Sequence, residues 1–285
     1  MKRFFLVKNP EKEGTEEVTA QIGSYLAGRG AECIPGPWHK ESVQHAWRYT
    51  NPQDVPADTQ CVITLGGDGT LIQAARDLVS LNIPFLGINL GTLGFLTQAT
   101  RQEDLKPVLD ALLLDQIQLE KRMMISGTIR SGDNILMADL ALNEIVITRK
   151  DTLRVLKFQV YLNGTFFNEY TADGVIIATP TGSTAYNLSA GGPIVTPAAR
   201  LMVMTPICAH TLNTRSIVLS PEDEIVIRMI GDGEQHHTAV FDGDVTADLG
   251  FGDTVEIRQA DRSTNLIKLK DVSFLDNLRS KMVHI

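Results

Sequence analysis

The sequence predicts an α/β amino-terminal domain with a parallel sheet, followed by a mostly antiparallel, β-rich carboxy-terminal domain. Over residues 1–115, strand-like and helix-like patterns alternate along the chain. The strand-like segments there are unbroken apolar runs, which are typical of parallel strands covered on both faces. From residue 116 to about 270, short segments rich in β-branched residues follow one another, with turn signals between them. These observations predict two domains, 1–115 and 116–270.

In the first domain, the expected helices and strands follow from periodicity and from the residues that end them. Gly28 and Gly30 end the first expected helix. Strands are expected at Phe4–Val7, Cys61–Leu65 and Pro84–Ile88, and helices at Thr15–Leu26, Thr70–Val79 and Glu103–Leu114.

In the second domain, strands are expected wherever β-branched residues cluster. Asn163-Gly164 and Asp232-Gly233 are typical hairpin turns between such strands. Asn163 also begins a glycosylation sequon, but no signal peptide is visible, so the turn interpretation is preferred. The tail Phe274–Val283 is expected to be a helix, and 271–285 to pack back on the first domain. The expected strands are Leu142–Thr148, Val155–Leu162, Val175–Thr179, Ile217–Leu219, Ile225–Met229 and Thr254–Arg258.

Composition limits the class of protein. The 285 residues are 43% hydrophobic and 21% charged, which is ordinary for a globular protein, and the net charge is −8. An acidic chain disfavours non-specific binding to nucleic acid or to a membrane surface, since both are anionic. The cysteines Cys33, Cys61 and Cys208 lie far apart and predict neither disulfides nor a zinc site. No segment has the length of a signal peptide core or a membrane span, so a cytoplasmic protein is expected.

A glycine-rich loop follows the strand expected at Cys61–Leu65. Its sequence is Gly66-Gly67-Asp68-Gly69-Thr70, and a helix is expected to begin there. Glycines let a ligand approach the backbone, and N–H groups at a helix N-terminus favour phosphate. Asp68 is the unusual member, because a carboxylate can accept a proton from a hydroxyl or hold a divalent cation. From these residues alone, a simple helix-capping role for Asp68 remains open.

The loop is neither a Walker A loop nor a Gly-x-Gly-x-x-Gly fingerprint, and the chain lacks the protein-kinase signatures. It resembles the loop shared by NAD kinases, diacylglycerol and sphingosine kinases and, more distantly, 6-phosphofructokinases. These families transfer a phosphoryl group from a nucleotide to a hydroxyl. The loop by itself does not identify the acceptor.

A second cluster lies in the run from Asp173 to Pro193, where an apolar strand is followed by many small hydroxyl residues. Ser183 or Thr184 could cap a short helix, and the hydroxyls and amides could bind phosphate or ribose oxygens. Tyr186 could stack on a base or belong to the core. Both the binding site and a purely structural capped helix remain open on these residues alone.

The run Asp173–Pro193 closely resembles the second signature of the NAD kinase family. The resemblance continues in Gly87–Leu96, in the pair Asn143-Glu144 and in Thr205–Arg215, in family order between about residues 61 and 219. Lipid kinases and phosphofructokinases share the first loop but not the second run. The resemblance implies transfer of the γ-phosphoryl of ATP, or of polyphosphate in some members, to the 2′-hydroxyl of the adenosine ribose of NAD.

The resemblance also implies roles for individual residues. Asp68 corresponds to the catalytic proton acceptor, in a phosphate loop with Gly66, Gly67 and Thr70. Asn143 and Glu144 correspond to the pair that binds the adenosine part of NAD. The other positions that correspond to NAD-binding residues are Gly69, Phe95, Arg154, Thr171, Asp173, Thr181, Thr184, Ala185, Tyr186, Asn187, Leu188 and Ser189. Arg154 could equally be a surface residue of a strand, and Phe95 a core residue.

One segment departs from the family. In Phe241-Asp242-Gly243-Asp244, many members carry glutamine where Asp244 stands, so that contact is either lost or changed here. His210, His236 and His237 are assigned no metal role, because isolated or adjacent histidines are more often structural. No protein metal site is expected, and Mg²⁺ is expected to accompany ATP.

Two other functions compete with this interpretation. A kinase for a lipid or sugar hydroxyl would not need the Asp173–Ser189 run. A non-catalytic NADP-binding sensor would not need the Asp68 carboxylate. NAD and ATP are therefore the expected partners, with a dimer or tetramer expected from the family.

Overall fold

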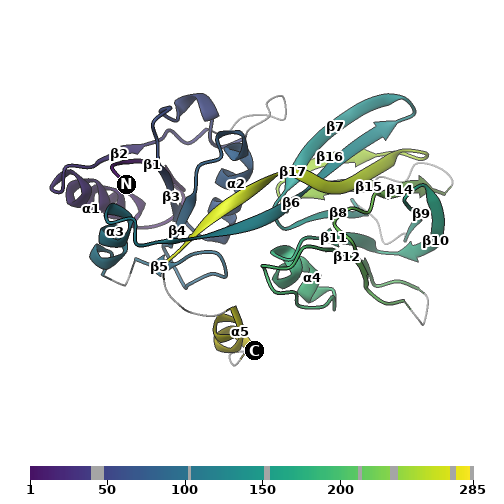
Figure 1. Ribbon diagram of the computed structural model, residues 1–285. Helices are drawn as coiled ribbons and strands as arrows, with labels where there is room; N and C mark the ends of the chain where they lie inside the picture. Colours follow the sequence, from purple (N-terminus) through teal and green to yellow (C-terminus); the bar gives the residue numbers. More distant parts are fainter. Residues whose placement is uncertain are drawn as a thin grey trace. The chain divides into compact units, whose positions relative to one another are not determined.

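The computed structural model describes residues 1–39, 48–101, 104–150, 155–210, 214–231, 237–269 and 274–282. The chain forms two compact units, one comprising Met1–Arg122 with Ser263–Ile285 and the other Met123–Arg262. Strands β6 (Gln118–Ser131) and β17 (Thr254–Lys268) each contain one of these boundaries. Each unit is described in turn (Figure 1).

The first unit contains the parallel sheet that the sequence predicts. Its strands are β1 (Arg3–Lys8), β2 (Glu32–Pro35), β3 (Cys61–Gly66), β4 (Phe85–Asn89) and β5 (Ala99–Thr100). They pair in parallel in the order β2-β1-β3-β4-β5, and the end of β17 adds a parallel pairing with β4 at Leu266 and Phe85. From β1 the chain winds to β2 on one side and to β3 on the other. In such sheets, ligands bind at the carboxyl ends of the strands where the winding reverses.

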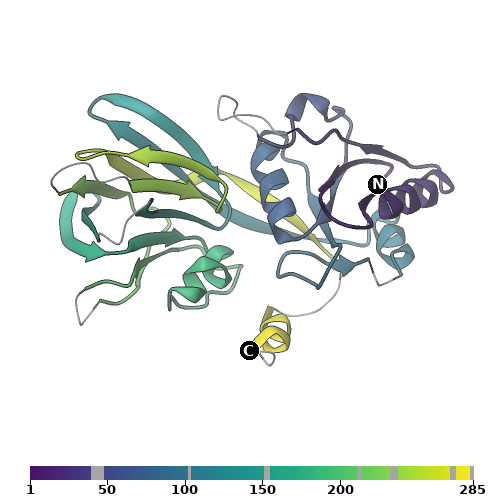
Figure 2. The same ribbon diagram turned by 180° about the vertical axis from the view of Figure 1, so that it is seen from behind.

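Helices cover both faces of this sheet, as the apolar strand runs predict. α1 (Thr15–Ala27) and α3 (Lys106–Leu113) pack on the face presented by Phe4 and Ile63. α2 (Asp68–Asp77) packs on the other face, where Leu71 approaches Gly87 of β4. Both views show α1 and α3 beside each other and apart from α2 (Figures 1 and 2). All six residues of β3 are buried, and Cys61 is a core residue as expected.

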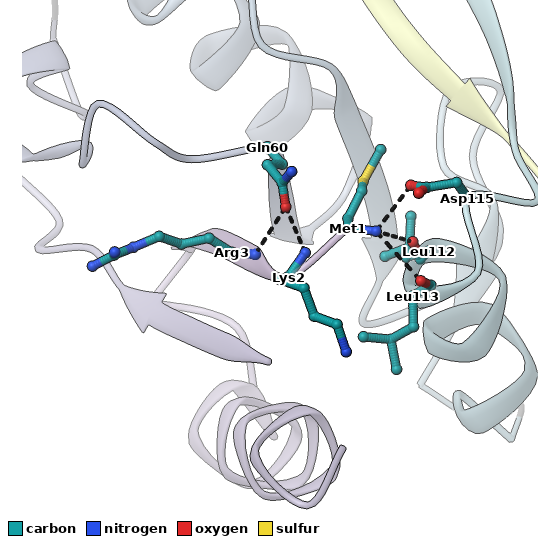
Figure 3. A network of polar contacts seen from close by, with 7 residues as sticks. All are labelled: Met1, Lys2, Arg3, Gln60, Leu112, Leu113 and Asp115. Atoms are coloured by element: carbon teal, nitrogen blue, oxygen red, sulfur yellow. Dashed lines mark hydrogen bonds and ion pairs between the residues drawn. The ribbon is translucent and has the colours of Figure 1, made fainter. Parts of the chain in front are cut away.

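Polar contacts at the start of β1 tie it to the end of α3 and to the residue before β3 (Figure 3). The ammonium of Met1 donates to the carbonyls of Leu112 and Leu113 at 3.1 and 3.4 Å and to the Asp115 carboxylate at 2.9 Å. Gln60 Oε1 accepts from the backbone N–H groups of Lys2 and Arg3. A positive charge at the C-terminus of a helix is stabilised by the helix dipole.

The second unit consists of antiparallel sheets that share a large core. One sheet has the order β13-β12-β11-β8-β15-β16, with strands Ile217–Leu219, Met202–Ile207, Gly174–Ala178, Glu144–Arg149, His237–Phe241 and Val245–Leu249. Facing it are β10 (Thr165–Ala172), β9 (Leu156–Leu162), β14 (Ile225–Ile230) and β17, with the hairpin of β6 and β7 (Asn134–Ala141). Side chains from both sets, such as Ile145 and Phe158, form the core.

The structure agrees with most expected elements and extends several of them. Asn163 and Gly164 form the expected turn between β9 and β10, with φ values of 52° and 76°. Asp232-Gly233 lies outside the described residues. α5 (Phe274–Met282) is the expected tail helix and belongs to the first unit. No helix in the described part of the chain is long and apolar enough to cross a membrane.

Candidate functional site

The loop Gly66–Thr70 joins β3 to α2 at the carboxyl edge of the parallel sheet, where the winding reverses. A Cβ atom on Gly66 would collide with the side chain of Thr70, so packing requires glycine there. A Cβ atom on Gly67 or Gly69 would meet nothing within 4 Å. Protein packing therefore does not explain these two glycines, whereas the approach of a ligand to the loop and to the first turn of α2 does.

Asp68 is the first residue of α2, and its carboxylate holds the segment that follows β4. Oδ2 accepts from the N–H of Phe95 at 2.6 Å, and Oδ1 accepts from Leu96 and Thr97 at 3.2 and 3.3 Å. The N-cap of α2 is Gly67, and no side chain caps the helix there. The capping alternative for Asp68 is therefore wrong, because its oxygens point to another segment.

Gly94 explains how Asp68 comes so close to this segment. A Cβ atom on Gly94 would overlap the Asp68 carboxylate. The N–H of Gly94 donates to Thr97 Oγ1 at 2.9 Å, which closes a tight turn. Phe95 is half-buried, so part of its ring remains accessible to a ligand. The structure thus brings Asp68, Gly94 and Phe95 into one cluster within the first unit.

In the second unit, a different aspartate holds the Asn143-Glu144 pair. Asp242 Oδ1 accepts from the N–H groups of Asn143 and Glu144 at 2.7 and 3.2 Å, and Oδ2 accepts from Leu142 at 2.8 Å. Asp242 adopts φ of 49° in the turn between β15 and β16, a conformation that aspartate tolerates better than most residues. Sequence reasoning missed Asp242, although it lies in the segment singled out for Asp244.

Asn143 and Glu144 both keep buried polar atoms without a hydrogen-bond partner among the described residues: Asn143 Oδ1 and Glu144 Oε2. Glu144 is only 6% exposed. Burial, and secondly the nearby Asp242 carboxylate, raise the pKa of Glu144 to about 8. Buried polar atoms without partners are rare in folded proteins and mark a place where a ligand can supply the missing hydrogen bonds.

The turn after β11 packs directly on this pair. Thr179 donates from its N–H to the carbonyl of Asn143 at 2.8 Å and from its hydroxyl to Leu142 at 2.6 Å. A Cβ atom on Gly182 would collide with the backbone of Asn143. The structure therefore brings the turn that carries Thr181 and Thr184 against Asn143, although the two segments are well separated in sequence.

The segment after this turn divides into side chains that face outward and side chains that hold it in place. Tyr186 is 44% exposed, so its assignment to the core is wrong and a stacking role remains open. Asn187 is fully buried and donates to Ser183 O and Pro193 O, while its Oδ1 accepts from Thr205 at 2.7 Å. The Asn187 side chain thus holds the segment together. α4 (Tyr186–Ser189) follows Ala185 without a side-chain cap, so capping by Ser183 or Thr184 is wrong.

Other predicted positions lie farther along β10 and the start of β11. Asp173 pairs with Arg149, with 3.3 Å between Oδ2 and the guanidinium, and Thr171 is half-buried. Arg154 lies outside the described residues. Leu188 and Ser189 are in α4, and Asp244 donates its N–H to Phe241 O in the β15–β16 turn. In the described part of the chain, no group of three or more His, Cys, Asp or Glu side chains could hold a metal ion.

Removing the Asp242 carboxylate should destabilise the second unit. Asp242→Ala leaves three backbone N–H groups without their acceptor and disfavours the φ of 49°, so we expect a loss of about 3 kcal/mol in the free energy of unfolding. Asp242→Asn keeps one acceptor oxygen and should lose less. Urea denaturation measures both.

Asp248→Asn provides the control, because that exposed carboxylate of β16 pairs with the surface residue Lys150. An Asp242→Ala protein as stable as this control would show that the three N–H groups do not need Asp242.

Glu144 should make stability depend on pH. Its folded pKa of about 8 lies above the ordinary 4.5, so the folded state retains a proton that the unfolded chain releases. Its contribution is complete below pH 4.5 and is lost as pH rises through about 8. Glu144→Gln should therefore flatten the fall of the unfolding midpoint over this window, while Glu169→Gln, at an exposed position, should not. Parallel profiles for Glu144→Gln and the unchanged protein would contradict a raised pKa.

Comparisons with known proteins agree with both halves of the chain. Residues 4–117 match the ATP-NAD kinase N-terminal domain, and residues 142–269 match the ATP-NAD kinase C-terminal domain. An NAD kinase of Lachnospira eligens is 42% identical over 99% of this chain and 100% of its own. An NAD kinase of Agathobacter rectalis is 41% identical over 99% of both chains.

Solved structures show the same fold. A yeast NADH kinase complexed with NADH is 25% identical, covers 99% of this chain and 87% of its own, and has a TM-score of 0.85. An NAD kinase from Archaeoglobus fulgidus in complex with ATP is 23% identical, covers 99% of both chains and has a TM-score of 0.76. With both of its domains matched and relatives above 40% identity along its whole length, the chain belongs to the ATP-NAD kinase family.

Proposed function

We propose that Asp68 is the group that accepts the proton of the NAD 2′-hydroxyl while the γ-phosphoryl of ATP is transferred to it. Membership of the family makes the chain an enzyme, a kinase that phosphorylates NAD to NADP. The observation that supports the role of Asp68 is its fixed carboxylate beside an open glycine loop. In phosphoryl transfer, positioning and charge stabilisation do most of the work.

The hydrogen bonds of Asp68 restrict where it can accept a proton. A carboxylate offers about four acceptor sites, and three backbone N–H groups use three of them. The remaining site has a fixed direction, because Leu96 and Thr97 hold one oxygen and Phe95 the other. A base that is already fixed in this way loses little conformational entropy when the hydroxyl binds.

The donor set fits a magnesium ion that arrives with ATP better than one that is held by the protein. Asp68 is the one carboxylate of the Gly66–Thr70 loop, and most of its acceptor capacity is used. Magnesium commonly keeps several waters and binds through substrate phosphates and one or two carboxylates. When bound with ATP, it would neutralise the phosphates over the Gly66–Thr70 loop, and Asp68 would keep its remaining acceptor site for the hydroxyl.

Asn143 and Glu144 are proposed to bind the adenosine part of NAD. Asn143 Oδ1 can accept a hydrogen bond, and Glu144, protonated below its pKa of about 8, can both donate and accept. Adenine and ribose carry such donors and acceptors. Tyr186 offers an exposed ring for stacking. The other residues of the second unit proposed to contact NAD are Arg154, Thr171, Asp173, Thr181, Thr184, Ala185, Asn187, Leu188 and Ser189. In the first unit, Gly69 and Phe95 are proposed to contact NAD.

A dimer or tetramer and a cytoplasmic location stay predictions. ATP is the proposed phosphoryl donor, with polyphosphate as the alternative donor that some members of the family use.

Asp68→Asn tests the proposed role. With ATP, Mg²⁺ and NAD present, we expect kcat to fall roughly 10²–10⁴-fold, the usual contribution of a general base, while the KM for NAD changes little. NADP formation measures kcat. Asp58→Asn, which removes an exposed carboxylate of the same unit, is the matched control.

Each other outcome identifies a different error. Turnover near that of the unchanged protein would show that Asp68 is not the base. A raised Mg²⁺ requirement as the main effect would make Asp68 a metal ligand instead. An unmodified protein that binds NAD in a thermal-shift assay but forms no NADP would be a sensor.

Gly94→Ala tests whether the position of the carboxylate matters. The added methyl group would overlap the Asp68 carboxylate, so we expect kcat to fall about 10- to 100-fold, as small misplacements of reacting groups do. Gly91→Ala adds the same methyl group in the same segment, where the nearest atom outside its chain neighbours is Asn89 Oδ1 at 3.7 Å. If both variants lose activity equally, the contact with Asp68 is not the cause.

A further inference from the structure

The tail helix α5 presents one half-buried face. Phe274, Leu278 and Lys281 are half-buried and recur at helical spacing, whereas Leu275 is 64% exposed. Both views show α5, in yellow, near the segment that follows β4 (Figures 1 and 2). Lys281 makes the contact: its Nζ donates to the carbonyl of Leu93 at 2.6 Å and lies 4.9 Å from the centroid of the Phe95 ring.

Lys281 contacts Leu93 and Phe95, which flank Gly94, the residue that packs against the Asp68 carboxylate. The Leu93 carbonyl binds the ammonium, Gly94 faces the Asp68 carboxylate, and the N–H of Phe95 donates to Asp68 Oδ2 at 2.6 Å. Three consecutive residues are thus held by Lys281 and by Asp68. A movement of this segment would move the N–H groups that orient the carboxylate.

We propose that Lys281 is a positioning residue for the reaction, which acts through the Leu93–Phe95 segment to hold the Asp68 carboxylate in its reactive direction. The inference rests on the proposed role of Asp68. A charge-assisted hydrogen bond and a cation over an aromatic ring both favour one position of the segment. A partly exposed lysine contributes little to global stability, so its effect appears in turnover.

Lys281→Met removes the ammonium but keeps a long side chain that can rest on the Phe95 ring. We expect kcat to fall about tenfold with an unchanged melting temperature, because positioning is lost and folding is not. Lys281→Arg should recover much of the loss, since a guanidinium can also donate to the Leu93 carbonyl and lie over the ring. Arg279→Met is the control: Arg279 lies on the same helix, is 77% exposed and pairs with Asp276 at 3.7 Å.

A double-mutant cycle with Asp68→Asn separates positioning from other roles. If Lys281 acts through the carboxylate, Lys281→Met should have little further effect on kcat when Asp68 is already replaced. Multiplying losses, or a raised KM for ATP, would make Lys281 an independent phosphate ligand and overturn the inference. A kcat of Lys281→Met equal to that of the unchanged protein would overturn it too.

The failure of the two proposals can be told apart. If Asp68→Asn alone keeps its turnover, the proposed role of Asp68 is wrong and the inference loses its basis. If Asp68→Asn loses turnover but the effects multiply, only the inference about Lys281 fails. A lowered melting temperature of Lys281→Met without recovery in Lys281→Arg would show a structural role and also overturn it.

Discussion

Hydrogen bonds from three successive backbone N–H groups to one aspartate hold the principal loop of each unit. In the first unit, Asp68 accepts from Phe95, Leu96 and Thr97. In the second, Asp242 accepts from Leu142, Asn143 and Glu144. Loops have few internal hydrogen bonds. One carboxylate can accept hydrogen bonds from several backbone N–H groups, so a single residue holds the loop.

Asp68 and Asp242 differ in what surrounds each carboxylate. Asp68 lies beside the open Gly67 and Gly69 and keeps acceptor capacity, so it can both organise the loop and take part in chemistry. Asp242 lies in a turn and orients the backbone of Leu142, Asn143 and Glu144. Its charge also disfavours ionisation of Glu144 and so adds to the effect of burial on that pKa. One kind of interaction thus fixes the proposed base in one unit and supports the Asn143-Glu144 pair in the other.

The helices, the strands and the Gly66–Thr70 loop could be predicted from the sequence, because each depends on a local pattern of residues. The apolar run of β3 and the Gly66–Thr70 loop are readable in a few residues, and the Asn163-Gly164 turn follows from its dipeptide. The pairing order β2-β1-β3-β4 is not local, so alternation alone did not give it. The role of Asp242 was missed for the same reason: its partners lie about 100 residues earlier, and they are backbone groups, which no side-chain pattern records. Asn187 is predicted to contact the ligand, and the structure adds that its buried amide also binds Ser183 and Thr205, which a local pattern does not record.

The buried polar side chains of Asn143 and Glu144 lower the stability of the folded protein. Folding alone therefore does not explain their presence. An apolar residue at the position of Glu144 would avoid desolvating a carboxyl group beside a second carboxylate. Glu144 is nevertheless buried, and in the described structure its Oε2 and Asn143 Oδ1 lack protein partners. Asp242 fixes the backbone of both residues by accepting their N–H groups. Rigid support under unsatisfied groups is what a binding site needs, because the ligand then supplies hydrogen bonds without having to order the loop. The same reasoning applies to Asp68, where Gly94 and the N–H groups of Phe95 to Thr97 fix the carboxylate before any substrate arrives.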